Sequence, residues 1–257
     1  MRILLKPLHY LYVIYAFLLF VILMIPVFLW ALLVSRFGKI KGGNLLYRAC
    51  TLWADIWFAL IFIQHRNVYI EKPKAHQSYI FVANHISYLD SAVLPKAFRR
   101  PVRPLGKVEI TKVPVFGTIY KTVIVTVDRS SAANRAKSVQ IMKGVLQNEI
   151  SVLVFPEGTF NMTGQPLKEF YDGAFRIAIE TGTPIMPVLF LNTYDRMHYA
   201  SIFSLNPGKS RSVFLPAISV EDLTAGDVAT LKQQVYHVME QGLRKYNVNW
   251  IKNQETH

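Results

Sequence analysis

The segment YIFVANHISYLD, residues 79–90, joins a short apolar run to two chemically active side chains. Residues 79–83 are predicted to form a buried β-strand, since a brief apolar run that ends in polar residues is typical of one. His85 follows that strand, and Asp90 comes five residues later, in front of an apolar run suited to begin a helix. Side chains just beyond the carboxyl ends of strands are well placed for chemistry in an open α/β sheet.

Two interpretations of His85 and Asp90 follow from the residues alone. If His85 lies in the turn and Asp90 at the helix entrance, the carboxylate can fold back onto the imidazole. The carboxylate would then accept a hydrogen bond from one ring nitrogen of His85 and leave the other nitrogen as a base. Alternatively, Asp90 caps the helix and His85 is an ordinary turn residue.

Apolar runs and helical patterns alternate through the rest of the chain. Further strand-like runs occupy residues 123–127, 152–155, 185–191 and 213–218, and helical patterns occupy residues 132–147, 173–181 and 227–246. This alternation predicts an α/β fold with a largely parallel sheet flanked by helices. Continuously apolar strands are typical of a sheet that is covered on both faces.

The N-terminal part of the chain is apolar enough to enter a membrane. Residues 8–34 contain no Asp, Glu, Lys or Arg, and this length is sufficient to cross about 30 Å of hydrocarbon. Pro26 is expected to kink a helix there. A second apolar stretch, residues 45–63, contains Arg48 and Asp55 and is less suited to span a bilayer.

Basic residues flank the first apolar stretch on both sides, and basic residues prefer the cytoplasmic side of a membrane. We therefore predict a hydrophobic helical hairpin for membrane attachment, kinked and re-entrant so that both basic flanks stay inside. The second stretch would lie amphipathic on the surface, and the remainder of the protein would lie at the cytoplasmic face. A single membrane span and a buried core hairpin are the alternatives. The predicted boundary separates residues 1–65, a membrane-associated helical segment, from residues 66–257, the α/β domain. The flanking residues are Arg2, Lys6, Arg36, Lys39 and Lys41.

The charge of the chain is concentrated in its first half. The net charge is +13; residues 1–137 carry nineteen basic and five acidic side chains, whereas residues 138–257 carry ten and eleven. A basic stretch runs from Lys96 to Lys112. It is interpreted either as a solvated face or as a surface for anionic headgroups or an acidic partner. Binding to nucleic acid would explain only the positive charge, and the apolar segments argue against that function.

Several classes of function are disfavoured by what the sequence lacks. Cys50 is the sole cysteine, which excludes an intramolecular disulfide framework, and no Cys/His cluster has the spacing of a metal site. No dinucleotide or P-loop fingerprint is present, and Ser87 lies outside any G-x-S-x-G elbow. The sequence predicts neither a metal nor a bound cofactor.

A second polar constellation, FPEGT at residues 155–159, follows the strand-like run at residues 152–155. Glu157 could hold hydroxyl groups of a substrate, and Gly158 permits close approach of the backbone. A proline-containing β-turn is the structural alternative.

Five segments together resemble the glycerolipid acyltransferase superfamily. NHISYLD is similar to its NHxxxxD signature and FPEGT to its second hallmark. Three further segments resemble motifs of the same family in the same order: GKVEI at 106–110, VDR at 127–129 and TPIMPV at 183–188. The resemblance covers residues 66–220, and the 1-acyl-sn-glycerol-3-phosphate acyltransferases are the most similar subgroup.

The resemblance implies a membrane-bound enzyme that moves a fatty acyl group from acyl carrier protein or coenzyme A to a lysolipid hydroxyl. The acceptor would be 1-acylglycerol 3-phosphate and the product phosphatidic acid. His85 would act as the general base and Asp90 would orient it. The implied binding residues are Gly106, Lys107 and Arg129 for the phosphate of the acceptor, and Glu157, Gly158 and Thr159 along the acceptor site.

Two departures from the family pattern concern the acceptor. Many relatives carry an arginine directly after FPEGT, where this chain has Phe160, and cations where it has Tyr171 and Asp172. Lys168 lies close by in the sequence. Because these cations are missing, a lyso-aminolipid is an alternative acceptor. A non-enzymatic lipid carrier is the alternative of another class, although the His85 and Asp90 pair is intact.

Overall fold

A seven-stranded sheet forms the centre of the computed structural model, which describes residues 5–127 and 132–252. Its strand order is β1-β7-β6-β2-β5-β3-β4. Neighbouring strands are parallel except β6 and β7, which are antiparallel. The predicted α/β fold with a largely parallel sheet is confirmed. The strands are β1 (Ile63–Tyr69), β2 (Ile80–Ala83), β3 (Val102–Lys107), β4 (Val125–Val127), β5 (Ser151–Val154), β6 (Ile185–Phe190) and β7 (Gly208–Phe214).

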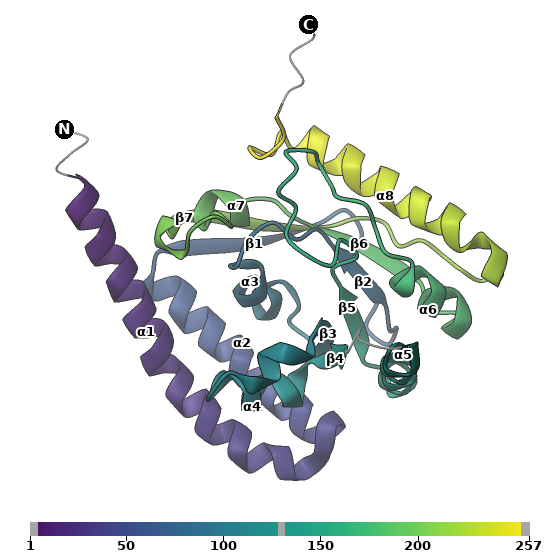
Figure 1. Cartoon of the computed structure of the whole chain (residues 1–257), viewed down its shortest axis with the longest axis horizontal. Coiled ribbons are helices and arrows are strands. Elements are labelled where there is room, and N and C mark those ends of the chain that lie inside the picture. Colours follow the sequence, from purple (N-terminus) through teal and green to yellow (C-terminus); the bar gives the residue numbers. More distant parts are fainter. Residues whose placement is uncertain (1–4, 128–131, 253–257) are drawn as a thin grey trace, which may run out of the picture.

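Helices cover both faces of the sheet (Figure 1). Phe81 packs into the core on the side of α1 to α4, whereas its neighbours Ile80 and Val82 pack against α5, α6 and α8. This alternation follows from the two-residue period of a strand, whose successive side chains point to opposite faces. The helices are α1 (Leu5–Val34), α2 (Gly43–Leu60), α3 (Asp90–Ala97), α4 (Phe116–Val123), α5 (Ala132–Gln147), α6 (Gly173–Thr181), α7 (Thr193–Arg196) and α8 (Val228–Lys245).

Two strands, β1 and β3, were not predicted from the sequence. β1 reads IQHRNVY and lies at an edge of the sheet, where polar side chains are tolerated. β3 reads VRPLGK, and its internal proline argues against a strand between two others. The structure also shifts two predicted strands: α4 extends to Val123, so β4 begins at Val125, and β7 begins at Gly208 rather than at residue 213.

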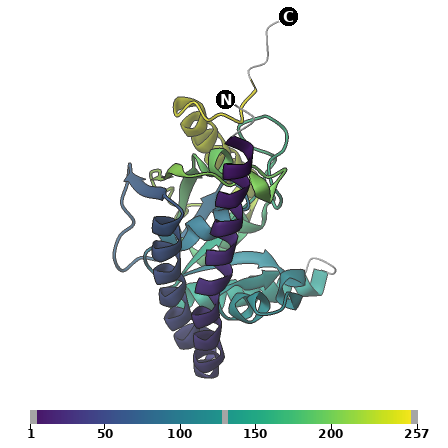
Figure 2. The ribbon, with the colours of Figure 1, turned by 90° about the vertical axis from the view of Figure 1, so that its left-hand side faces the viewer.

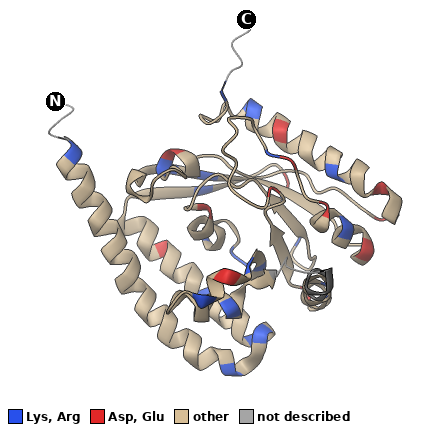
Figure 3. Ribbon diagram, viewed as in Figure 1, with Lys and Arg blue, Asp and Glu red and all other residues tan. Residues whose placement is uncertain are grey.

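The N-terminal residues form a helical hairpin in which α1 and α2 lie side by side (Figures 1 and 2). Residues Ser35–Phe37 and Gly38–Gly42 form the turn between them. α1 continues through Pro26 as one helix, so the first apolar stretch does not fold back on itself there as the re-entrant prediction required. Figure 3 shows basic residues at the two ends of α1 and none along it. By length and composition this segment could cross a membrane.

One side of α1 is buried in the protein and the other is exposed. Val13, Ala16 and Ala31 are fully buried, whereas Leu18 and Ile22 are more than half exposed. β1 begins at Ile63, two residues after α2 and its C-cap, so the hairpin runs almost directly into the sheet. Exposed apolar side chains continue along the helix at Leu11, Ile14, Val21, Ile25, Leu29, Leu32 and Leu33.

A buried arginine fixes the turn of the hairpin to the sheet. The Arg103 side chain, on β3, is 2% exposed, and its Nη2 donates to the carbonyl oxygens of Lys39 and Ile40 at 3.1 and 3.2 Å. The same nitrogen lies 2.7 Å from Asn44 Oδ1. A Cβ on Gly43 would lie 2.7 Å from that nitrogen, so this position favours glycine. Burial lowers the pKa of Arg103 to about 10.

The basic stretch from Lys96 to Lys112 is not a continuous solvated face, which was one of its two sequence interpretations. Lys96 Nζ and Arg99 Nη2 form ion pairs with Asp55 of α2, at 2.6 and 2.8 Å. Arg103 is buried against the hairpin turn. Lys96, Arg99 and Arg103 therefore hold α2 and the hairpin turn against the domain.

Candidate active site

His85 and Asp90 form a hydrogen-bonded pair at the end of β2. His85 Nδ1 lies 2.8 Å from Asp90 Oδ2, and the Asp90 side chain is fully buried whereas that of His85 is 19% exposed. α3 begins at Asp90, which places the carboxylate at the helix entrance. Because Nδ1 faces a carboxylate, it is assigned the proton, and Nε2 is left as an acceptor.

The backbone of the turn also holds Asp90 in place. Asp90 Oδ2 accepts the backbone N–H groups of Ile86 and Ser87 at 2.8 and 2.9 Å. Ser87 Oγ in turn donates to the carbonyl oxygen of Met197 and accepts from the N–H of Leu89. Ser87 is therefore a structural residue of this turn, and its hydroxyl does not face His85.

Aromatic rings confine the imidazole of His85. The Phe155 ring stacks on it at a centroid distance of 4.1 Å, and the Phe160 ring meets it edge-on at 4.4 Å. Tyr88 in turn packs against Phe160 at 4.8 Å. These contacts leave the ring little freedom to rotate away from Asp90.

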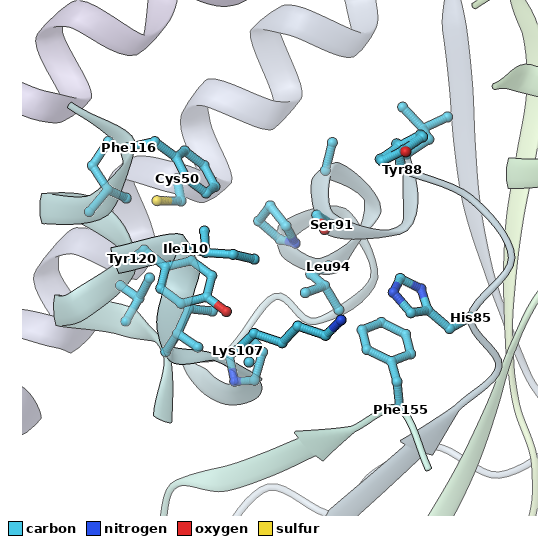
Figure 4. Close-up of a pocket in the computed structure, with 18 of the residues that line it drawn as sticks. Cys50, His85, Tyr88, Ser91, Leu94, Lys107, Ile110, Phe116, Tyr120 and Phe155 are labelled. Carbon is cyan, nitrogen blue, oxygen red and sulfur yellow. The ribbon is translucent and has the colours of Figure 1, made fainter. Parts of the chain in front are cut away.

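A cavity of about 720 Å³ opens beside His85, and most of its wall is apolar. Lys107, at the end of β3, extends across the cavity toward His85, whereas Cys50 and Phe116 lie at the opposite end (Figure 4). Gly158 and Thr159 also line it. The hairpin supplies a large part of the wall through Phe17, Phe20, Met24, Tyr47, Cys50, Trp53 and Trp57.

Glu157 is placed differently from the expectation that it lines the acceptor site. Its side chain is fully buried and is absent from the cavity wall. Oε1 accepts the backbone N–H of His85 at 2.9 Å, and Oε2 accepts that of Lys168 at 2.8 Å. Burial raises the pKa of Glu157 to about 7. Its carboxylate links the His85 turn to the loop that carries Lys168.

The glycines predicted for the site have local structural reasons. A Cβ on Gly106 would collide with the hydroxyl of Tyr120, so glycine permits β3 and α4 to pack. Gly158 has a φ of 71°, in the left-handed region that favours glycine. Arg129 lies outside the described residues. Within residues 5–127 and 132–252, no group of three His, Cys, Asp or Glu side chains could hold a metal ion.

Comparisons with known proteins agree with this geometry. The model of a family described as Acyltransferase matches residues 65–191. The 1-acyl-sn-glycerol-3-phosphate acyltransferase of Salmonella typhimurium is 32% identical over 178 residues, which cover 66% of this chain and 70% of that protein. The Escherichia coli protein of the same name is 30% identical over the same shares. The chain belongs to the 1-acyl-sn-glycerol-3-phosphate acyltransferase family.

A solved structure extends the likeness to the whole chain. The crystal structure of the 1-acyl-sn-glycerophosphate acyltransferase from Thermotoga maritima aligns with a TM-score of 0.73 and 20% identity. The alignment covers 98% of this chain and 100% of that one. At this identity the match supports the shared fold, hairpin included, and the sequence relatives identify the protein as a glycerolipid acyltransferase.

The structure of this acyltransferase adds site residues that motif reasoning missed. Trp53, Trp57 and Phe20 line the cavity from the hairpin, which was expected to act only as an anchor. Trp57 Nε1 donates to the carbonyl oxygen of Ala16, and Trp53 stacks on Trp57 at 5.4 Å. A cluster of aromatic residues on the apolar face of α2 is the sequence signal that could have indicated this wall.

Proposed function

We propose that this acyltransferase transfers a fatty acyl group from a thioester of acyl carrier protein or coenzyme A to 1-acylglycerol 3-phosphate, which yields phosphatidic acid. The observation that carries the proposal is the buried Asp90 held on His85 Nδ1 beside a long apolar cavity. Such a cavity suits an acyl chain, and the orientation of the pair leaves Nε2 able to take a proton.

The reaction then follows from the positions of the two groups. His85 Nε2 removes the proton from the acceptor hydroxyl as its oxygen attacks the thioester carbonyl carbon. The tetrahedral intermediate collapses, the C–S bond breaks, and the departing thiolate takes the proton from the imidazolium. Asp90 stabilises the imidazolium while it exists, and no covalent acyl-enzyme forms. General-base catalysis of this kind contributes about 10²–10⁴-fold.

An acceptor panel tests the proposal. Purified protein in mixed micelles is given a labelled acyl thioester with lysophosphatidate, lysophospholipids, 1-monoacylglycerol or lyso-aminolipids in turn. We expect lysophosphatidate to give the highest kcat/KM. Preferred acylation of an uncharged or zwitterionic acceptor would overturn the choice of acceptor, and absence of transfer to every acceptor would overturn the function.

A lyso-aminolipid is the second candidate acceptor. Phe160 occupies the position at which the family resemblance predicts an arginine, and it packs on His85 and Tyr88. Asp172 also replaces an expected cation, but its carboxylate pairs with Lys232 at 2.6 Å. The added acid is therefore neutralised within the domain, which weakens the case for this candidate.

We also propose that the hairpin holds the protein in a membrane, with both ends of α1 and the catalytic domain on the cytoplasmic side. The exposed apolar face of α1 supports attachment, since contiguous apolar surface of this extent is typical of a lipid interface. The basic residues at both ends of α1 support the orientation.

Cysteine labelling distinguishes the hairpin from a single span. In a Cys50→Ser background, Lys6→Cys and Lys39→Cys are introduced one at a time and probed with a membrane-impermeant reagent in intact cells. If both ends of α1 lie on the cytoplasmic side, neither position reacts until the membrane is opened. Labelling of only one of the two in intact cells would indicate a single span.

A further inference from the structure

Lys168 lies beside the active site without a carboxylate partner in the described part of the chain. Its Nζ donates to Thr159 Oγ1 at 2.8 Å, and Thr159 lines the same cavity as His85. None of the ion pairs among the described residues includes Lys168. A lysine that forms no ion pair and is hydrogen-bonded to a residue of the cavity wall is available to an anionic ligand.

The position of the Lys168 backbone is fixed relative to the catalytic pair. Glu157 Oε2 accepts the N–H of Lys168 at 2.8 Å, while Glu157 Oε1 accepts the N–H of His85 at 2.9 Å. One fully buried carboxylate therefore joins the backbone of the histidine to that of the lysine. This link holds the two loops at a set separation, as a site that places a hydroxyl and a headgroup of one substrate requires.

The surroundings of Thr159 also favour an anion. The backbone N–H groups of Thr159 and Phe160 form no hydrogen bond to another described residue. Lys107 extends into the same cavity from β3 (Figure 4). Phe160 itself packs edge-on against His85 and supplies no charge.

We propose that Lys168 binds the phosphate of the acceptor and thereby supplies the cation that Phe160 does not. This inference rests on the proposed function and deepens it, because it assigns the recognition of the headgroup to a residue outside the FPEGT motif. Thr159 holds the ammonium group beside the cavity wall through its hydroxyl, and Lys107 contacts the phosphate from the other strand end. The lysine makes phosphate-bearing acceptors preferred over those that lack the phosphate.

Steady-state kinetics of Lys168→Met and Lys168→Arg test the inference. Loss of one hydrogen bond to a charged group corresponds to about a tenfold to hundredfold loss of affinity. We expect Lys168→Met to raise KM for lysophosphatidate by about tenfold or more, while kcat and KM for the thioester stay near those of the wild type. Lys168→Arg should keep most of the affinity. Lys245→Met, an exposed change on α8, is the matched control.

A second acceptor separates recognition of phosphate from general damage. For 1-monoacylglycerol, kcat/KM should change little in Lys168→Met, so the preference for lysophosphatidate over this acceptor should shrink by about the factor lost in KM. An equal loss on both acceptors, or an unchanged KM for lysophosphatidate, would overturn the role of Lys168 and leave the proposed function standing. If the wild type transferred to neither acceptor, the proposed function would fall and this inference with it.

Discussion

Asp90 Oδ2 lies 2.8 Å from His85 Nδ1 and accepts two backbone N–H groups of the turn between them. The five-residue separation, awkward on a single helix face, works because His85 is in the turn and Asp90 begins α3. The three hydrogen bonds at one oxygen fix the carboxylate before any substrate arrives, so the orientation of the imidazole is part of the fold.

Substitutions at this pair should separate folding from catalysis. We expect His85→Ala to fold and to lose about 10²–10⁴-fold in kcat, since the general base is removed. Asp90→Asn should also lose much of the rate, because an amide in place of the carboxylate can stabilise the opposite tautomer of His85. Transfer rates and circular dichroism of the purified variants check both. Retention of most activity by a folded His85→Ala would remove His85 from the mechanism.

The buried carboxyl of Glu157 predicts a pH-dependent stability. The pKa is about 7 in the folded protein, above the ordinary 4.5 of an unfolded chain. Between these values the unfolded chain has lost the proton that the folded protein keeps. The free energy of unfolding should therefore fall as the pH rises from about 4.5 to about 7, by up to about 3 kcal/mol.

Glu157→Gln isolates this contribution. The amide cannot titrate, and its NH₂ would face one of the two backbone N–H groups that Glu157 accepts, so the variant should be less stable at pH 5. Its deficit relative to the wild type should shrink toward pH 8. Thermal midpoints in detergent at both pH values provide the measurement, and two parallel pH profiles would contradict the assignment.

Removal of the buried Arg103 should loosen the hairpin turn. Arg103→Met leaves the carbonyl oxygens of Lys39 and Ile40 without their donor. Loss of hydrogen bonds to a buried charged group costs about 1.5–3 kcal/mol, so a lower thermal midpoint is expected. Arg66→Met, at an exposed site on β1, serves as the control. Equal midpoints for the two variants would show that Arg103 does not hold the turn.

The far end of the cavity should limit the length of the acyl chain. Cys50 lies at the end opposite His85 (Figure 4), and Cys50→Phe would fill part of that space. We expect the preferred acyl donor to become shorter by a few carbons, with little loss of rate on short donors. Leu52→Phe, on the exposed face of the same helix, should leave the preference unchanged. A series of thioesters of increasing chain length tests this.

Much of this architecture could be predicted because its signals are local. The apolar runs at β2, β5 and β6 are buried on both faces, and polar motifs follow the first two at one edge of the sheet. The edge strand β1 and the proline-containing β3 could not be predicted, since tertiary pairing overrides their composition.

The roles of charged residues were harder to predict than the elements. A run of cations does not reveal that Lys96 and Arg99 pair with Asp55, 41 and 44 residues away in the chain. The motif FPEGT likewise does not reveal that Glu157 faces the interior. Its partners are the backbone N–H groups of residues 72 positions before it and 11 positions after it, which no sequence spacing indicates.

The pairing of β1 with β7 has a consequence for when the sheet can form during synthesis. Ile63 pairs with Gly208, about 145 residues later in the chain. At the usual pace of synthesis, about 5–20 residues per second, the strand that leaves the hairpin waits on the order of 10 s for its partner. During this interval β1 cannot join the sheet, because β7, its only neighbouring strand in the described sheet, has not been made. Truncated nascent chains that end before residue 208 should therefore remain dependent on chaperones.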